Sequence, residues 1–458
     1  MQDASIIAAL ATPPGQGGVA IIRVSGTGAI ELVAGLFHGK GTLADKPTHT
    51  IHFGKLCDDS RVVDEVLVSV MRGPHTFTGE DVAEINCHGS GAAVRKILQL
   101  LLRSGARLAG RGEFTKRAFL NGRMDLSQAE AVLDVIQAES GSALQVAVNQ
   151  LEGKLSEKIR AMRDRLLHQY AAVQAEADFP EEGVSGMEED VMLAECQQVR
   201  QQLRELQRSA QVGRLVKQGV QTVLCGTPNA GKSSLLNALL GENRAIVTEV
   251  PGTTRDCIEE YLELENCTLR LLDTAGIRDT ADQVEQIGVD RARASLDGAD
   301  LILFVADCSR PPSADDRSLC SQLQQKKTPV LLVLNKQDKT QGQEAAYQAL
   351  LPNAPSVAVS AKEKQGLEDL SSAICKLFHL GDIRDGQQAL ITNLRHKEAV
   401  QRASAAVDQV VHTLEIGMPA DMVFVDLQDA ISALGEVTGE TVQDEVVDRI
   451  FSEFCVGK

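Results

Sequence analysis

The chain has 458 residues, which is room for roughly two to four domains with separate hydrophobic cores. Hydrophobic residues make up 43% of it and charged residues 24%, values that exclude a membrane bundle and a predominantly disordered chain. The formal net charge of −17 repels a phosphate backbone and therefore disfavours a protein that clamps nucleic acid by itself.

The N-terminal part, residues 1–121, combines short β-like runs with glycine-rich turns. Strands are expected at 19–24 and 62–70, and one helix is expected at 92–102. This mixture predicts an α+β domain.

Helical periodicity replaces this pattern from about residue 125, and an acidic breaker at 179–183 divides the long helices. The first part of a helical domain is therefore predicted over 122–218. Helical spacing returns over 391–414 and 422–454, so 381–458 is predicted to be its second part.

The intervening block, 219–380, alternates buried apolar strands with helical segments, as a doubly wound parallel sheet requires. Its strands are expected at 220–225, 269–272, 301–305 and 330–334. The simplest architecture inserts this α/β block into the helical domain, whose two parts then pack as one core. The predicted fold class is thus multidomain, α/β plus all-α.

A phosphate-binding loop is the strongest motif, because residues 226–233 match G-x-x-x-x-G-K-[ST] between a predicted strand and helix. Backbone N–H groups of such a loop converge on phosphate oxygens, Lys232 neutralises the β and γ charges, and Ser233 can bind Mg²⁺. The loop predicts nucleotide binding.

Three further motifs predict that the nucleotide is GTP. Asp273 to Gly276 follow a predicted strand, where the carboxylate can support the Mg²⁺ shell and the glycine N–H can meet the γ-phosphate. Asp338, in Asn335-Lys336-Gln337-Asp338, can accept from two guanine donors that adenine lacks. Ser360-Ala361-Lys362 completes the guanine pocket. The residues expected to contact GTP are Asn229, Ala230, Gly231, Lys232, Ser233, Ser234, Thr248, Glu249, Val250, Pro251, Gly252, Thr253, Thr254, Asp273, Thr274, Ala275, Gly276, Asn335, Lys336, Asp338, Ser360, Ala361 and Lys362.

The order of these motifs resembles the translation-factor class of GTPases, but Ile277 stands where Ras-like proteins carry the glutamine that orients the attacking water. Glu285, just downstream, is the candidate for that role; a solvated helix carboxylate is the alternative interpretation. Thr254 would add a second hydroxyl to Mg²⁺ beside Ser233.

Charge compensation at the phosphates leaves two alternatives open. Oxygens of Asn229 and of the 248–256 loop could cage K⁺, with Thr248, Val250 and Thr253 as the further ligands. Arg255 could instead act as an arginine finger, in cis or across a dimer.

Two N-terminal stretches, 11–26 and 112–122, and the C-terminal Phe454-Cys455-Val456-Gly457-Lys458 resemble the MnmE (TrmE) family over essentially the whole chain. The loop around Arg255 and the missing glutamine also resemble the K⁺-dependent GTPases that include Era and Der. The resemblance implies a GTPase that works with the flavoprotein MnmG (GidA) in a heterotetramer. Together they would install an aminomethyl or carboxymethylaminomethyl group at C5 of the wobble uridine of certain tRNAs.

The resemblance further implies that the N-terminal domain dimerises and binds 5,10-methylene- or 5-formyl-tetrahydrofolate as the one-carbon donor. On matching positions, Arg23, Glu80, Arg123 and Lys458 would contact the folate. Arg and Lys can pair its carboxylates, and Glu80 can accept from the pteridine N–H groups. Cys455 is a candidate nucleophile or redox participant, although a small buried thiol is an equal alternative.

The net charge favours a tRNA held mainly by the partner protein. The ten cysteines include no Cys-x-x-Cys pair, which fits reduced thiols and a cytoplasmic location. A regulatory or ribosome-assembly switch like Era is the competing functional class. A folate-binding scaffold whose GTPase is only regulatory is a third interpretation.

Overall fold

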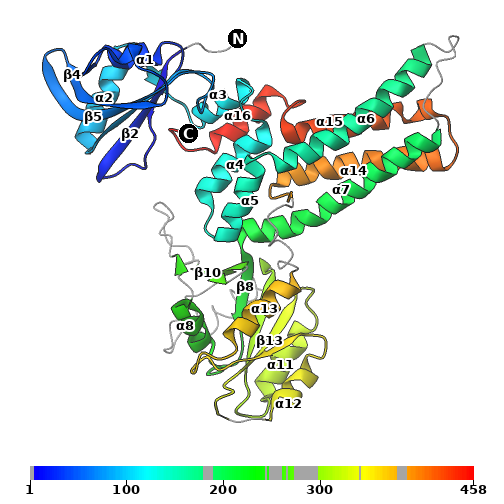
Figure 1. The fold of residues 1–458 in the computed structure, drawn as a ribbon. Helices are drawn as coiled ribbons and strands as arrows, with labels where there is room; N and C mark the ends of the chain where they lie inside the picture. Colours follow the sequence, from blue (N-terminus) through cyan, green and yellow to red (C-terminus); the bar gives the residue numbers. More distant parts are fainter. Residues whose placement is uncertain are drawn as a thin grey trace. The chain divides into compact units, whose positions relative to one another are not determined.

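The computed structural model describes residues 5–178, 189–242, 245–246, 260–264, 267–272, 298–339, 342–378 and 389–458. The chain forms two compact units, and each is discontinuous in sequence (Figure 1). Unit 1 comprises Met1–Ile136, Gln150–Leu193 and Ala405–Lys458, and unit 2 comprises Gln137–Asn149 and Ala194–Ser404.

An antiparallel sheet with one parallel edge pair forms the N-terminal part of unit 1, in the order β3-β4-β5-β6-β2-β1-β7. Its strands are β1 (Ile7–Leu10), β2 (Gly17–Ser25), β3 (Phe37–Gly39), β4 (Thr50–Asp58), β5 (Arg61–Met71), β6 (Val82–Gly89) and β7 (Arg107–Leu108). Helices α1 (Ala29–Ala34) and α2 (Gly91–Arg103) cover one face of it (Figure 1). This is the α+β layer arrangement predicted from the sequence.

The two faces of this sheet differ because side chains alternate along each strand. On β5, Val66, Val68 and Val70 are buried in the core beneath the helices. On the opposite face, Ile51 and Phe53 of β4 are 64% and 65% exposed, and Phe53 pairs across the strands with Leu67. One apolar face of the sheet is therefore open.

The helices that lie wholly or mainly in unit 1 come from both ends of the sequence. They are α3 (Glu113–Leu120), α4 (Leu126–Gln137), α6 (Lys154–Asp178), α15 (Phe424–Thr438) and α16 (Asp444–Ser452), with a 3₁₀ turn at Ala420–Val423. Helix α6 packs against α15, and Tyr170 stacks on Phe424 with ring centroids 4.4 Å apart. Helices from before and after the inserted block thus share a core, as expected.

The predicted helical run at 422–454 is divided into two helices. Gly439, with a φ of +89°, ends α15 in the left-handed conformation that glycine adopts without strain. The N–H groups of Gly439 and Glu440 both donate to Gly435 O and cap the helix. Besides α4, whose last residue belongs to unit 2, the helices α5 (Gly141–Leu151), α7 (Glu189–Gln218) and α14 (Leu394–Glu415) have residues in both units.

Unit 2 contains a second sheet in the order β14-β13-β12-β8-β11-β10-β9, in which β14 to β11 are parallel. Its strands are β8 (Val220–Cys225), β9 (Ala245–Ile246), β10 (Glu260–Leu264), β11 (Cys267–Leu271), β12 (Leu301–Asp307), β13 (Val330–Asn335) and β14 (Ser356–Ala358). The predicted strands lie within or overlap β8, β11, β12 and β13. The sheet is doubly wound, as the apolar runs indicated.

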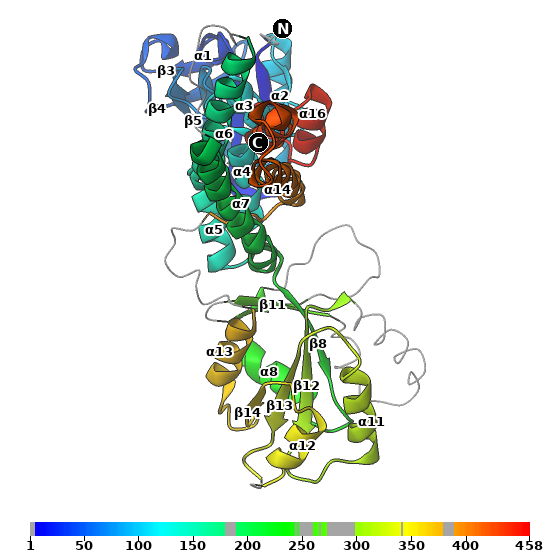
Figure 2. The ribbon, with the colours of Figure 1, turned by 90° about the vertical axis from the view of Figure 1, so that its right-hand side faces the viewer.

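Helices cover both faces of this sheet (Figure 2). Helices α8 (Lys232–Glu242) and α13 (Leu367–Leu377) pack on one face, and α11 (Ala314–Leu323) and α12 (Glu344–Leu350) pack on the other. The predicted fold class, with the α/β block inserted into a helical domain, is confirmed. The domain limits after residues 121, 218 and 380 stay predictions.

Among the described residues, no helix combines the length and the apolar character needed to cross a bilayer.

Candidate functional site

The phosphate-binding loop connects β8 to α8 in unit 2, at the carboxyl end of a central parallel strand. Gly231 has a φ of +98°. A Cβ at this position would lie 2.2 Å from Asn335 Nδ2, so any larger residue would collide with the Asn335 side chain. Asn229 also has a positive φ, +63°, which asparagine tolerates better than most residues. The loop is thus built around a tight backbone path.

Side chains hold the loop's carbonyl groups. Lys232 Nζ donates to Gly226 O at 2.7 Å and to Thr227 O at 3.2 Å. Asn335 Nδ2 donates to Ala230 O at 3.0 Å, so the N–H of the same trans peptide points the opposite way. Burial lowers the pKa of Lys232, whose ammonium group contacts neutral carbonyls here, and an anionic phosphate would stabilise its charge.

Lys336 supports the loop from the carboxyl end of β13, two strands from β8 in the sheet. Its Nζ donates to Asn229 O at 2.6 Å and lies 2.7 Å from Asp307 Oδ2. Burial would raise the pKa of Asp307, but hydrogen bonds from Lys336 and Ser309 outweigh it and hold the pKa below its ordinary value. Asp307 is therefore an ionised group that fixes Lys336 against the loop.

Thr227 forms a third support. Its hydroxyl donates to Asp316 Oδ1 at 2.8 Å and accepts from Arg310 Nη2 at 3.1 Å. Asp316 is fully buried in the first turn of α11, where it also accepts from Ser313 and from the Tyr347 hydroxyl. The connection between β12 and α11 thereby contacts the phosphate-binding loop.

The predicted base pocket comes together at the ends of β13 and β14. Ser360 Oγ donates to Asp338 Oδ1 at 2.8 Å, and this hydrogen bond is the main reason that the pKa of Asp338 lies below its ordinary value. Asn335 Oδ1 accepts from Ala361 N at 3.1 Å. Asp338 is exposed and ionised, so its second oxygen can meet a ligand.

The other predicted residues of this site divide into two groups. Ser233, Ser234 and Lys362 are described and exposed. Thr248, Glu249, Val250, Pro251, Gly252, Thr253, Thr254, Arg255, Asp273, Thr274, Ala275, Gly276 and Glu285 lie outside the described residues. The described half of the site contains the loop, Lys232 and the base pocket.

A second polar site lies in the N-terminal sheet of unit 1. Arg23 Nε is 2.8 Å from Glu84 Oε1, and its guanidinium lies over the rings of Phe77 and Phe114, 5.4 and 5.6 Å from the centroids. Among the described residues, none accepts a hydrogen bond from Arg23 Nη1, although that atom is buried. Burial and then the neighbouring Arg23 lower the pKa of Lys458. These two cations fit an anionic ligand.

Glu80 belongs to a hydrogen-bonded network of charged side chains in the same domain. Its carboxylate accepts from Ser25 Oγ at 2.9 Å and from Arg117 Nη1 at 3.1 Å. Arg117 is 7% exposed, and its Nη2 donates to Ser5 O at 2.9 Å and to Glu113 at 3.2 Å. No role was predicted for Arg117 or Glu113 from the sequence.

The C-terminal residues reach the same domain. Gly112 N donates to Cys455 O at 3.3 Å, and Arg111 forms a β-bridge with Val456. Cys455 is exposed, which disfavours its interpretation as a buried thiol. Arg123 is exposed too; two residues before it, Asn121 donates to Thr78 O in the loop that carries Glu80.

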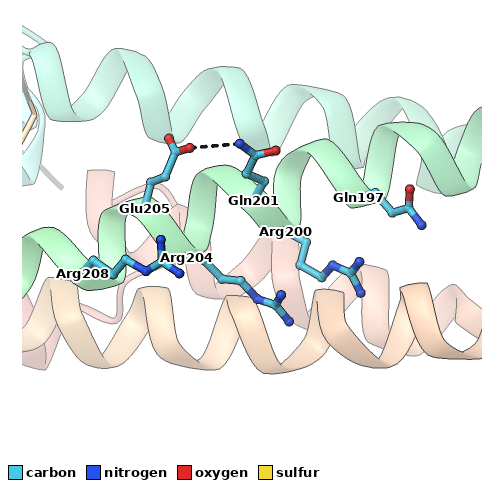
Figure 3. Close-up of a pocket in the computed structure, with 6 residues that line it drawn as sticks. All are labelled: Gln197, Arg200, Gln201, Arg204, Glu205 and Arg208. Atoms are coloured by element: carbon cyan, nitrogen blue, oxygen red, sulfur yellow. Dashed lines mark hydrogen bonds between the residues drawn. The ribbon is translucent and has the colours of Figure 1, made fainter.

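A surface hollow of about 420 Å³ lies along α7 and includes none of the residues predicted from the sequence (Figure 3). It is lined by Gln197, Arg200, Gln201, Arg204, Glu205 and Arg208. The three arginines are spaced at four residues and share one face of the helix, while Gln201 donates to Glu205 at 3.2 Å.

Asp307, Arg310 and Asp316 are the residues of the nucleotide site that sequence reasoning missed. One signal was available: Ser313-x-x-Asp316 has the spacing of a capping box, and the structure forms it. Nothing local in the sequence indicates that the cap also contacts Thr227.

Comparisons with known proteins identify the family of the chain. The model of the MnmE helical domain matches residues 126–455, and that of the GTP-binding protein TrmE N-terminus matches residues 6–123. A tRNA modification GTPase MnmE of Oceanobacillus iheyensis is 44% identical over all of both chains. The chain belongs to the MnmE family. A second relative of that name, from Geobacillus thermodenitrificans, is 45% identical, again over all of both chains.

Family membership confirms the sequence-based identification as a tRNA modification GTPase and does not favour the Era-like alternative. Among solved structures, the G domain of the T. maritima FeoB iron transporter matches at 29% identity. That match covers 34% of this chain and 97% of the other, with a TM-score of 0.27.

Proposed function

We propose that this chain hydrolyses GTP in a K⁺-stimulated reaction that serves modification of tRNA at C5 of the wobble uridine. The modifying unit would be an aminomethyl or carboxymethylaminomethyl group built from a tetrahydrofolate one-carbon unit together with the flavoprotein MnmG. The observation that carries the proposal is the full-length match to the MnmE family, which includes both the phosphate-binding loop and the N-terminal domain.

GTP binding is supported by the chemistry of the described half-site. Two carbonyl groups of the phosphate-binding loop accept hydrogen bonds from Lys232 Nζ. The ammonium group can exchange these bonds for hydrogen bonds to phosphate oxygens while it stays in the loop. Asp338 presents an ionised carboxylate that matches the two donors on guanine. Glu285 would orient the attacking water.

Two of the proposed ligands of the cations, Asn229 and Ser233, belong to the described residues. Bound Mg²⁺ and K⁺ would neutralise charge that develops on the phosphates during transfer. Ser233 and Thr254 would hold Mg²⁺, and Asn229, Thr248, Val250 and Thr253 would hold K⁺. Asn229 and Ser233 are both exposed at the start of α8, where an oxygen ligand can reach an incoming nucleotide.

The folate proposal is supported by the buried Arg23 Nη1, which needs an acceptor. Arg23 and Lys458 would pair the carboxylates of tetrahydrofolate, which supplies a one-carbon unit when bound. Glu80 would accept from the pteridine, and Arg123 would provide a further cation. Cys455 lies three residues before Lys458 and is the candidate catalytic thiol.

A homodimer through the N-terminal domain is supported by the open apolar face of its sheet. Ile51 and Phe53 on β4 and Val19 on β2 are each more than 60% exposed, and Leu67 on β5, next to β4, is 45% exposed. Burying such a surface against a second copy would remove it from water. Phe53→Asp should therefore shift the sedimentation of the full-length protein from dimer to monomer, whereas a wild-type monomer would contradict this part of the proposal.

The partner MnmG would hold most of the tRNA, because a chain of net charge −17 repels phosphates. Tight tRNA binding by this chain alone would contradict that. A cytoplasmic location is part of the same proposal.

The primary test is steady-state GTP hydrolysis in KCl and in NaCl at equal ionic strength, with Glu285→Ala measured in parallel. Strong stimulation by K⁺ that the variant loses would support cation-assisted hydrolysis. Equal rates in both salts would contradict the K⁺ site and favour Arg255 as the source of positive charge. Asp338→Asn should change nucleotide preference from GTP toward xanthosine triphosphate, because an amide presents a donor where the carboxylate accepts.

A further inference from the structure

We propose that Arg310 is a positioning residue for the phosphate-binding loop and sets nucleotide affinity through the Thr227 side chain. This inference rests on the proposed GTP-binding function and deepens it. Arg310 lies in the turn between β12 and α11, about 80 residues from the loop in sequence, and belongs to none of the nucleotide-binding motifs.

Three groups hold the Arg310 guanidinium. Its Nη2 donates to Thr227 Oγ1 at 3.1 Å and lies 3.3 Å from Asp316 Oδ2, while its Nε lies 3.9 Å from Asp307 Oδ2. The planar fork therefore spans two carboxylates and the hydroxyl of the loop. Such a geometry fixes orientation as well as charge.

Asp316 and Arg310 together fix the orientation of the Thr227 hydroxyl group. It donates a hydrogen bond to Asp316 Oδ1 at 2.8 Å and accepts one from Arg310 Nη2, and the residue is 7% exposed. The carbonyl of the same residue accepts from Lys232 Nζ at 3.2 Å. Anchoring the Thr227 side chain thus positions a carbonyl that holds the phosphate-binding lysine.

Arg310 also balances the charge around the loop. Burial would raise the pKa of Asp316, but hydrogen bonds from Ser313 and Thr227 and the charge of Arg310 outweigh it and keep the carboxylate ionised. Asp307 is ionised as well and is paired with Lys336. Without Arg310, two carboxylates close to the phosphate site would repel a triphosphate more strongly.

Arg310 lies outside the hydrophobic core. Its side chain is 38% exposed, whereas Asp316 is fully buried and supports α11. Arg317, an exposed residue one position after Asp316, provides the matched control because Arg317→Gln makes the same charge change nearby.

The experiment measures equilibrium binding of fluorescent mant-GDP to the full-length protein, together with KM and kcat for GTP, well below each variant's melting temperature. Arg310→Gln should weaken binding and raise KM by roughly tenfold, the effect of losing one hydrogen bond to a charged group, with kcat within about twofold. Arg317→Gln should match wild type. Thr227→Val should weaken mant-GDP binding as much as Arg310→Gln does, whereas Thr227→Ser, which keeps the hydroxyl, should bind like wild type. The double variant Thr227→Val with Arg310→Gln should bind mant-GDP no more weakly than either single variant.

Two results would overturn the inference: wild-type affinity in Arg310→Gln, or fully additive losses in the double variant. Failure of the wild-type protein to bind mant-GDP would instead contradict the proposed GTP-binding function, so the two failures are distinguishable.

Discussion

Helix α3 carries two adjacent cationic residues whose ion pairs differ in burial, and replacing each by glutamine separates their energetic contributions. Arg117 is 8% exposed at its side chain and contacts Glu80 and Glu113, which are 22% and 16% exposed. Lys116 pairs with Asp448, and those side chains are 33% and 63% exposed. We expect Arg117→Gln to destabilise the N-terminal sheet strongly and Lys116→Gln to leave it almost unchanged.

The magnitude follows from what each substitution leaves behind. Removing one partner of a buried pair costs about 3–5 kcal/mol, because the other charge stays buried without compensation. Glu80 keeps its bond from Ser25 and Glu113 keeps Arg107, which favours the lower end, about 3 kcal/mol. The exposed pair of Lys116 should contribute about 0–1 kcal/mol.

Hydrogen exchange of the full-length protein, followed by mass spectrometry, measures the local opening of this sheet. Peptides from β1 and β2 should lose protection by roughly 100-fold in Arg117→Gln, since each 1.4 kcal/mol is about tenfold in an opening equilibrium. Lys116→Gln is the matched control and should exchange like wild type. Equal protection in the two variants would contradict the expectation that the burial of an ion pair decides how much stability is lost when one partner is replaced.

Three further outcomes are expected. Burial would raise the pKa of Glu113, but hydrogen bonds from Arg107 and Gly110 N outweigh burial and lower the pKa. The ionised Glu113 therefore stabilises the fold fully above its ordinary pKa of 4.5, and this stabilisation is lost as pH falls through the lower pKa of the folded state. Hydrogen exchange of β1 should accordingly accelerate only below about pH 4.5. Burial raises the pKa of Cys87 to about 11, so iodoacetamide at pH 8 should modify exposed Cys455 much sooner, as peptide mapping would show; equal rates would contradict the assigned burial. Gly231→Ala should abolish mant-GDP binding at unchanged expression, because its Cβ would lie 2.2 Å from the side chain that supports the loop; retained affinity would mean that the loop can rearrange.

The parallel sheet and its phosphate-binding loop could be predicted from the sequence because their signals are local. Buried parallel strands are continuous apolar runs, and the predicted strand at 220–225 coincides with β8. Strand β4 was not predicted. Its apolar residues Ile51 and Phe53 point to the open face, whereas Gly54 and Leu56 are buried, so the apolar pattern changes face along the strand and matches no single half-buried face.

The supports of the loop could not be predicted in the same way. Arg310 and Asp316 read as ordinary polar residues before a helix, and only the fold brings them to Thr227. Arg117 was likewise visible within a family motif, but its contacts with Ser5 and Glu80 join segments far apart in sequence. Long-range polar networks leave no periodicity from which to infer them.

The packing of α6 against α15 imposes an order on biosynthesis. About 250 residues separate the end of α6 from the start of α15, so at roughly 5–20 residues per second a ribosome needs about 12 to 50 s between them. During that interval the apolar face of α6, with Leu155, Ile159 and Met162, lacks the helix that packs against it, and all strands of the unit 2 sheet are synthesised before the interval ends. The nascent chain should therefore expose a hydrophobic surface to chaperones until the second half of the helical core emerges.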